Sequence, residues 1–311
     1  MSNPTNSRAE SIARVLPALD YSKIAIYLLV MTFAAFFIAP IWTGLVTAFK
    51  TTGAVTATTP FLPPGPDGFT LQKWTTAIEY LSTGMTNSLL MSFPATIASV
   101  TLGSTAAYGL TLVDWHKRTQ FAVLVLFMFG IFIPYQAVLV PLSDFWINMV
   151  GIDGLVGPVL GDLPFFTERH SRLVAVTFTH VVYGIPICML LFRGYYVALS
   201  DELIEAAKID GASITSIYRR IVLPLSKPMF GVVFIYQFTM IWNEFLFSLT
   251  LIGSSASPAA TVTLVLSGLG SDLSGVDFGL RMAGAFVAAL PTLIIYILFA
   301  EQFAKGLASD N

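Results

Sequence analysis

Long apolar runs separated by short polar segments dominate this chain. A helix that crosses the hydrocarbon core of a bilayer needs roughly 20 mostly apolar residues, and six runs reach that length. We predict membrane-spanning helices at residues 24–48, 87–113, 121–142, 173–192, 229–252 and 282–303. The third, fourth and sixth runs contain Pro134, Pro186 and Pro291. Neighbouring membrane helices tolerate such prolines because they satisfy the freed carbonyl. The pattern therefore indicates an all-α integral membrane protein with one membrane domain.

The second apolar run differs from the others because it is rich in small residues. Small side chains let helix backbones approach closely in lipid. We therefore predict that this helix packs centrally. The small residues are Ala95, Ala98, Gly103, Ser104, Ala106, Ala107 and Gly109.

The polar segments on one side of the predicted helices suggest some local structure. Residues 60–68 are rich in turn-forming proline and glycine. Apolar residues then recur at helical spacing from Leu71 to Leu81, which predicts a short amphipathic helix on the outer surface. We expect irregular structure with short helical turns at 143–172 and a Ser/Gly-rich loop at 253–279.

The distribution of Lys and Arg orients the helices. Charged residues make up 11% of the chain, against about 25% in soluble domains, and Lys and Arg favour cytoplasmic segments. With the N-terminus inside, eleven basic residues fall in cytoplasmic segments and five outside. We therefore predict that both termini and the 193–228 loop are cytoplasmic. The first apolar run is longer than the roughly 7–15 residues of a signal-peptide core, so residues 1–23 are predicted to be an uncleaved cytoplasmic segment.

Catalytic and metal chemistry is not indicated by this sequence. Cys188 is the single cysteine, so neither a disulfide framework nor a Cys-rich zinc site is expected. The three histidines lie far apart, and no zinc-protease, serine-hydrolase or phosphate-loop motif occurs. The net charge of −2 gives no argument for nucleic-acid binding. We assign no catalytic residue, metal ligand or cofactor to this chain.

The polar stretch at 200–224 predicts two short helices that meet at an angle. Ser200 is a plausible N-cap of the first helix, with acids in its first turn. Gly211 ends it, since glycine adopts the left-handed conformation readily. Ser213 caps the second helix and Pro224 ends it. On capping and periodicity alone, an amphipathic hairpin on the inner leaflet explains this stretch equally well.

The spacing within this stretch carries a family resemblance. Glu205-Ala206-Ala207, Gly211, Ile221 and Leu223-Pro224 follow the pattern EAA-x3-G-x9-I-x-LP. This pattern resembles the cytoplasmic loop of ABC importer permeases. Other stretches make residues 24–307 similar to the second, shorter permease of carbohydrate importers of the maltose type. These stretches are Asn87-Ser88-Leu89, Ile133-Pro134-Tyr135-Gln136, Trp242-Asn243-Glu244-Phe245 and Gln302-Phe303 with Gly306-Leu307.

The resemblance implies a fold, partners and a mechanism. The fold is the type I ABC importer permease fold in the bacterial inner membrane. A second permease completes the path for a sugar or sugar derivative, a periplasmic solute-binding protein delivers it, and two ATPase subunits bind ATP and Mg²⁺. The implied ATPase-coupling residues are Glu205, Ala206, Ala207, Asp210 and Gly211, with Leu223 and Pro224 closing the motif. Related subunits often carry a longer basic tail than residues 308–311, so this chain gives no basis for a tail contact.

Polar residues within the predicted spans are candidates for lining or gating a path. Glu244 either lies near the outer headgroups, bonded to a neighbouring loop, or faces a cavity. His180 is either a hydrogen-bond partner between helices or a substrate ligand. The aromatic rings of Tyr183 and Tyr236 either pack between helices or stack on a sugar. The path-lining candidates are Gln136, His180, Tyr183, Gln237, Asn243 and Glu244.

Three other functions remain to be weighed. An importer permease for a non-sugar solute has the same loop. A secondary transporter normally uses several buried charges or inverted repeats, whereas this chain has one acid well inside a predicted span and no visible repeat. A membrane enzyme would need clustered chemical groups, which the spans lack.

Overall fold

The computed structural model describes residues 21–151, 170–199, 201–272 and 275–308, with side chains as far as residue 302. The chain forms two units, Met1–Thr70 and Leu71–Asn311. The predicted N-cap Ser200 and most of the 143–172 segment lie outside the described residues.

The first unit is built on one apolar helix, α2 (Tyr21–Ala48). Most of its side chains up to Trp42 are exposed within this chain, and they are apolar on every side of the helix. Such a helix suits lipid or other membrane helices rather than water. The first predicted span is confirmed as a helix, and α2 is long and apolar enough to cross a membrane.

A compact loop follows α2 and contains α3 (Thr52–Ala57) and the 3₁₀ turn η1 (Pro66–Gly68). The Thr70 amide donates to the Phe49 carbonyl at 2.8 Å and closes the loop. The Phe49 ring stacks on Phe69. Lys50 is 1% exposed and donates from Nζ to the Thr59 carbonyl at 2.7 Å. These contacts hold the turn-rich segment against the residues that follow α2.

The second unit is organised around α4 (Gln72–Leu112), a helix of 41 residues. The predicted short surface helix is not separate, because it continues into the second span as α4. No proline lies within α4 before Pro94, so the helix runs on from the surface segment into the span. A Cβ at Gly84 would lie 3.2 Å from the Cα of Val262, so glycine here lets the outer loop pack closely.

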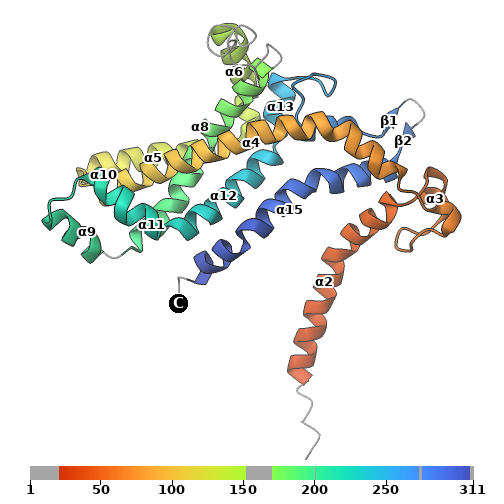
Figure 1. Ribbon diagram of the computed structural model, residues 1–311, viewed down its shortest axis with the longest axis horizontal. Coiled ribbons are helices and arrows are strands. Elements are labelled where there is room, and N and C mark those ends of the chain that lie inside the picture. Colours follow the sequence, from red (N-terminus) through yellow and green to blue (C-terminus); the bar gives the residue numbers. More distant parts are fainter. Residues whose placement is uncertain (1–20, 152–169, 200, 273–274, 309–311) are drawn as a thin grey trace, which may run out of the picture. The chain divides into compact units, whose positions relative to one another are not determined.

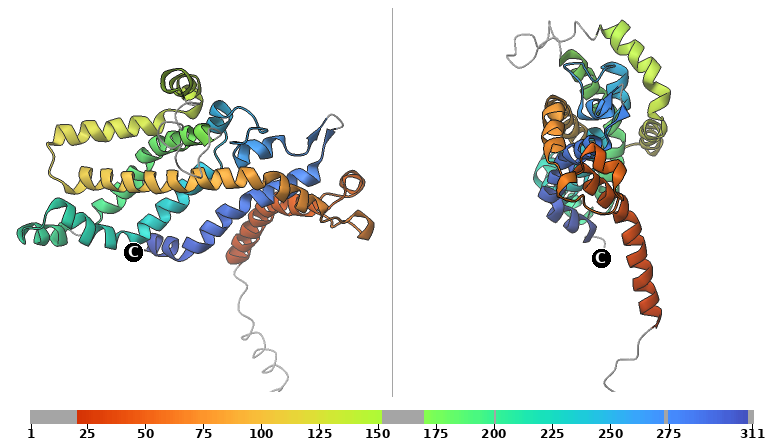
Figure 2. Two further views of the ribbon diagram at one scale, coloured as in Figure 1. Left: turned by 45° about the horizontal axis from the view of Figure 1, so that its top comes forward. Right: turned by 90° about the vertical axis from the view of Figure 1, so that its right-hand side faces the viewer.

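The predicted central packing of the small-residue helix is confirmed. In Figures 1 and 2, α4 lies against α8 (Ser171–Val197), α12 (Lys227–Trp242) and α15 (Phe278–Ala308). The closest approach is to α8, where a Cβ at Gly103 would lie 2.4 Å from Cys188 Cβ and 2.9 Å from the Met189 nitrogen. Only glycine at position 103 allows this backbone separation.

Two of the predicted spans are broken. Four helices in the described chain are long and apolar enough to cross a membrane, or up to six if each bent pair is one span. One bent pair joins α5 (Lys117–Phe132) to α6 (Tyr135–Asp144) and the π-helix η2 (Phe145–Val150) at 94°. The predicted continuous helix at 121–142 is therefore wrong. Proline disfavours helical backbone at the residue before it, and the chain is extended at Ile133–Pro134.

The fifth predicted span is also interrupted. α12 ends at Trp242, Asn243 to Phe245 are not helical, and α13 (Leu246–Leu251) follows. A 76° bend joins α12 to the loop helices before it. By contrast, α8 continues through Pro186 and α15 through Pro291, as predicted.

The segment at 253–279 has more structure than the predicted loop. It contains α14 (Val262–Gly268) and an antiparallel pair, β1 (Ser271–Asp272) with β2 (Gly275–Val276). Asn87 on α4 donates from Nδ2 to the Pro258 and Ala260 carbonyls, both at 2.9 Å. Ser88 Oγ accepts the Val262 amide at 2.8 Å. These two side chains fasten the segment to α4.

We predict that Gly103→Leu destabilises the protein, because the added side chain collides with the α8 backbone and overpacking typically costs about 1–3 kcal/mol. Gly109→Ala on the same helix is the matched control. A Cβ there meets nothing within 4 Å, and alanine favours helix by about 1 kcal/mol. The melting temperature of the purified protein should be lower for Gly103→Leu than for the wild type, and should not be lowered by Gly109→Ala. Equal melting temperatures for the two variants would contradict the close α4–α8 contact.

Candidate functional site

A cavity of about 300 Å³ lies where the broken helix α5–α6 meets α8 and α12. Gly130 to Gln136 form one wall, His180 to Ile187 a second and Tyr236 to Ile241 a third. The break at Pro134 turns Tyr135 and Gln136 toward this space. The sequence feature that interrupts the third span thus also shapes the cavity.

Four of the six predicted path-lining residues border this cavity. They are Gln136, His180, Tyr183 and Gln237. The amide of Asn243 instead bonds to the Thr239 carbonyl, and Asn243 is exposed outside the cavity wall. Glu244 also lies outside the wall. Tyr236, considered as a ring that could stack on a sugar, also lines the cavity. Tyr135 lines it too and was not among the candidates, although the proline before it marked this region.

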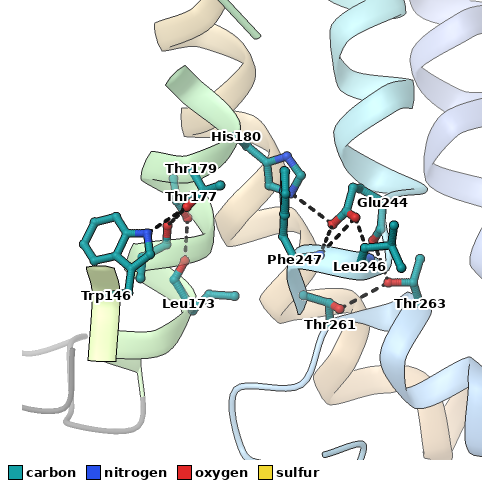
Figure 3. A network of polar contacts seen from close by, with 11 residues as sticks. Trp146, Leu173, Thr177, Thr179, His180, Glu244, Leu246, Phe247, Thr261 and Thr263 are labelled. Atoms are coloured by element: carbon teal, nitrogen blue, oxygen red, sulfur yellow. Dashed lines mark hydrogen bonds and ion pairs between the residues drawn. The ribbon is translucent and has the colours of Figure 1, made fainter. Parts of the chain in front are cut away.

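Glu244 caps the helix that follows it (Figure 3). Its Oε1 accepts the backbone amides of Leu246 and Phe247, and its main-chain carbonyl accepts the Thr263 hydroxyl at 2.9 Å. The residue is 8% exposed. Backbone donors compensate the loss of water around the carboxylate. Its contacts fix the junction between α12 and α13.

His180 lines the cavity and also lies next to Glu244. Its Nε2 lies 3.6 Å from Glu244 Oε2, an ion-pair distance drawn as a dashed line in Figure 3. The buried Nε2 has no hydrogen-bond partner among the described residues. Its ring lies edge-on to Phe247, with centroids 5.3 Å apart. Within the described residues, no three His, Cys, Asp or Glu side chains are close enough to hold a metal ion.

The predicted angled helices at 200–224 are present. α9 (Asp201–Ile209) is followed by Gly211 at φ +78°, and Ser213 Oγ accepts the Ser216 amide at the start of α10 (Ile214–Ile217). The second helix continues through the π-turn η5 (Tyr218–Val222) and α11 (Leu223–Leu225). It thus passes Pro224 by one residue rather than ending there.

One face of α9 is open. Glu205, Ala206 and Asp210 are exposed, as is Gly211, and Ala207 is partly buried. Ile204 on the opposite face is buried in a cluster with Ile217, Val222 and residues of α4 and α8. The small exposed side chains leave a shallow surface, held in place by the buried face behind it.

Buried hydroxyl groups join this loop to the membrane helices. Ser104 on α4 is hydrogen-bonded to the hydroxyls of Tyr196 on α8 at 2.6 Å and Tyr218 in the loop at 2.8 Å. Tyr108 on α4 donates to the Ile214 carbonyl at 2.8 Å. Such bonds are directional, so they fix the loop's orientation as well as its position. We call Ser104, Tyr196 and Tyr218 the hydroxyl cluster.

Comparison with known proteins decides the family. Residues 99–307 match the family described as "Binding-protein-dependent transport system inner membrane component". This chain belongs to that family of ABC importer permeases. The matched range includes both the cavity and the angled loop.

Two of the named relatives are permease subunits of sugar transport systems. The chain is 53% identical over 310 residues to the xylose/arabinose import permease protein XacI of Haloferax volcanii, with all of both chains covered. It is 29% identical to the arabinooligosaccharides transport system permease protein AraQ of Bacillus subtilis, over 71% of this chain and 70% of that one. The chain is therefore a sugar ABC importer permease by family.

Solved structures support the fold. A bacterial alginate ABC transporter in complex with alginate pentasaccharide-bound periplasmic protein includes a chain with TM-score 0.65 and 17% identity, covering 93% of this chain and 94% of that one. A second structure of an ABC transporter that imports alginate gives a TM-score of 0.62 at 18% identity, over 91% and 96% of the two chains. The permease thus has the type I importer fold.

We predict that Ser104→Ala lowers the stability of the permease, because it removes the buried partner shared by two tyrosine hydroxyls, at a cost of about 1–3 kcal/mol. Ser82→Ala is the control, since the exposed Ser82 hydroxyl bonds only within its own helix turn, to the Glu79 carbonyl. Thermal unfolding of both variants checks this. If Ser104→Ala and Ser82→Ala have the same melting temperature, the hydroxyl cluster contributes nothing to the stability of the permease.

Proposed function

We propose that this permease forms, with a second permease, the path of a binding-protein-dependent importer for a sugar, driven by separate ATPase subunits. ATP and Mg²⁺ bind in those partners, and this chain contributes no catalytic group. Both termini and the 193–228 loop face the cytoplasm, and the complex lies in the cytoplasmic membrane. A periplasmic-type binding protein delivers the sugar from outside.

The angled loop is the observation that carries this proposal. Its outer face presents Glu205, Ala206, Asp210 and Gly211 to a partner. Its inner face is packed against α4 and α8 through the buried cluster that contains Ile204. A partner that pulls the outer face therefore moves the membrane helices with it. Leu223 and Pro224 close the motif where the chain bends into α12.

The substrate class follows from the relatives and from the cavity. The relative that is 53% identical over the full chain is named as a xylose/arabinose permease. The cavity wall carries amides, phenols and an imidazole but no Asp, Glu, Lys or Arg. We therefore propose a neutral sugar of the pentose class. A charged solute would require a wall with charged groups.

We predict that Gly211→Trp weakens binding of the ATPase subunits. The backbone at position 211 has φ +78°, which costs an ordinary side chain about 1–2 kcal/mol, and a Cβ there projects into open space where the partner would approach. Gly211→Asn is the matched control, because asparagine tolerates this conformation. The measurement is co-purification of the ATPase with the tagged permease, alongside ATP-driven sugar uptake in proteoliposomes.

The Asn variant should keep the ATPase and most of the uptake, whereas the Trp variant should lose both. The binding protein should retain its affinity for sugar in each case. If Gly211→Trp keeps the ATPase and transports normally, the docking assignment is wrong.

A further inference from the structure

The segment from Ile214 to Lys227 carries positive charge that its surroundings do not neutralise. Arg219, Arg220 and Lys227 are exposed, and their side chains make no hydrogen bond or ion pair with a described residue. No Asp or Glu occurs within this segment. The three cations are therefore available to an anion from outside the chain.

The two arginines lie on the outward face of a helix whose inward face is fixed. The Tyr218 hydroxyl is hydrogen-bonded to Ser104, and Val222 is fully buried against α4 and α8. Arg219 and Arg220 precede the exposed Leu223 by four and three residues, a spacing that places side chains on one side of a helix. Cations and an apolar side chain thus share one outward face.

The bend before α12 sets the direction of this face relative to the membrane. The helix Ile214–Leu225 meets α12 at 76°, close to perpendicular to the segment that enters the membrane. Two adjacent arginines are costly in the hydrocarbon core. The helix therefore lies along the membrane surface. The Tyr195 hydroxyl donates to the Leu225 carbonyl at 2.9 Å and holds the bend against α8.

The chemistry of this face matches an anionic lipid. Guanidinium groups bind phosphate through two parallel hydrogen bonds, and basic clusters beside a membrane span favour anionic headgroups. Leu223 is 36% exposed and Leu225 is 45% exposed, next to these cations. Exposed leucines at the membrane surface suit acyl chains. The exposed acids of this loop, Glu205 and Asp210, lie instead on α9.

We propose that Arg219 and Arg220, with Lys227 at the bend, bind the phosphate of an anionic phospholipid headgroup, whose acyl chains contact Leu223 and Leu225. This rests on the proposed placement of the loop at the cytoplasmic membrane surface and goes beyond it by naming a lipid partner. A headgroup bound here holds the bend at a fixed depth and leaves the outer face of α9 open to the ATPase.

The experiment locates the lipid by crosslinking. The complete importer complex is reconstituted in phosphatidylcholine vesicles that contain a trace of phosphatidylglycerol with a photoreactive group beside its headgroup. A parallel sample contains phosphatidylcholine with the same photoreactive group. Mass spectrometry of the digested permease gives the crosslinking yield on residues 214–227. Unlabelled phosphatidylglycerol and inorganic phosphate are the competitors, and phosphate is compared with chloride at the same ionic strength.

The wild-type yield should be higher with the phosphatidylglycerol probe than with the phosphatidylcholine probe, and unlabelled phosphatidylglycerol should lower it. Arg219→Gln combined with Arg220→Gln should reduce the phosphatidylglycerol yield by about 5-fold or more, because each cation near an anionic surface contributes about a 5-fold change in binding. Replacement of both arginines by lysine should preserve most of the yield, since the charge remains.

Lys117→Gln combined with Arg118→Gln is the matched control, because it removes the same charge from exposed residues at the start of α5. It should leave the yield on residues 214–227 unchanged. An equal fall in this control would show an effect of net charge alone and would overturn the site. Equal wild-type yields with the two probes would also overturn it.

Two further results would assign the face to another ligand and overturn the lipid site. The first is displacement by inorganic phosphate as complete as displacement by unlabelled phosphatidylglycerol. The second is loss of the ATPase from the Gln variant while its crosslinking stays at the wild-type level. A wild-type complex that crosslinks as expected but shows no ATP-driven sugar uptake would instead count against the proposed function alone.

Discussion

The backbone contact between α4 and α8 is the constraint on which the other arrangements depend. In lipid, helices gain little from burying apolar side chains, so close packing and polar bonds hold them together. Gly103 brings α4 against the Cys188–Met189 backbone, and Ser99 and Ser104 form bonds at either side of that point. The cavity lies on one side of this contact and the angled loop on the other. The α4–α8 pair therefore fixes the positions of both.

This arrangement provides a mechanical connection between loop and cavity. The loop continues through Pro224 and a 76° bend directly into α12, which carries Tyr236 and Gln237. The hydroxyl cluster joins the same loop to α4 and α8, and α8 carries His180 and Tyr183. On the proposed mechanism, displacement of the loop would reorient two walls of the cavity. The third wall, at the α5–α6 break, follows α8 through the contact of Gly130 with Pro186.

The sequence predicted the features that depend on local rules and missed those that depend on packing. The length of the apolar runs predicted the membrane helices, and Gly211 predicted the turn between the two loop helices. Both predictions rest on conformational or solvent preferences of the residues themselves. The break at Pro134 and the end of α12 at Trp242 were missed. A proline or a polar residue within an apolar run can either lie inside a continuous helix or end it, and the sequence does not say which. Glu244 could be identified as unusual from sequence, but its role as a helix cap required the fold. The hydroxyl cluster joins residues from three separate segments, which no spacing pattern reveals.

The most direct test is the side of the membrane on which the loop lies. Ile209 at the end of α9 is 85% exposed, so Ile209→Cys presents a thiol to solvent. The single native cysteine, Cys188, is fully buried and should give little background. A maleimide that does not cross membranes should label this variant in inside-out vesicles and leave it unlabelled in intact cells. Rapid labelling in intact cells would place the loop outside, where no ATPase could move it, and would contradict the mechanism.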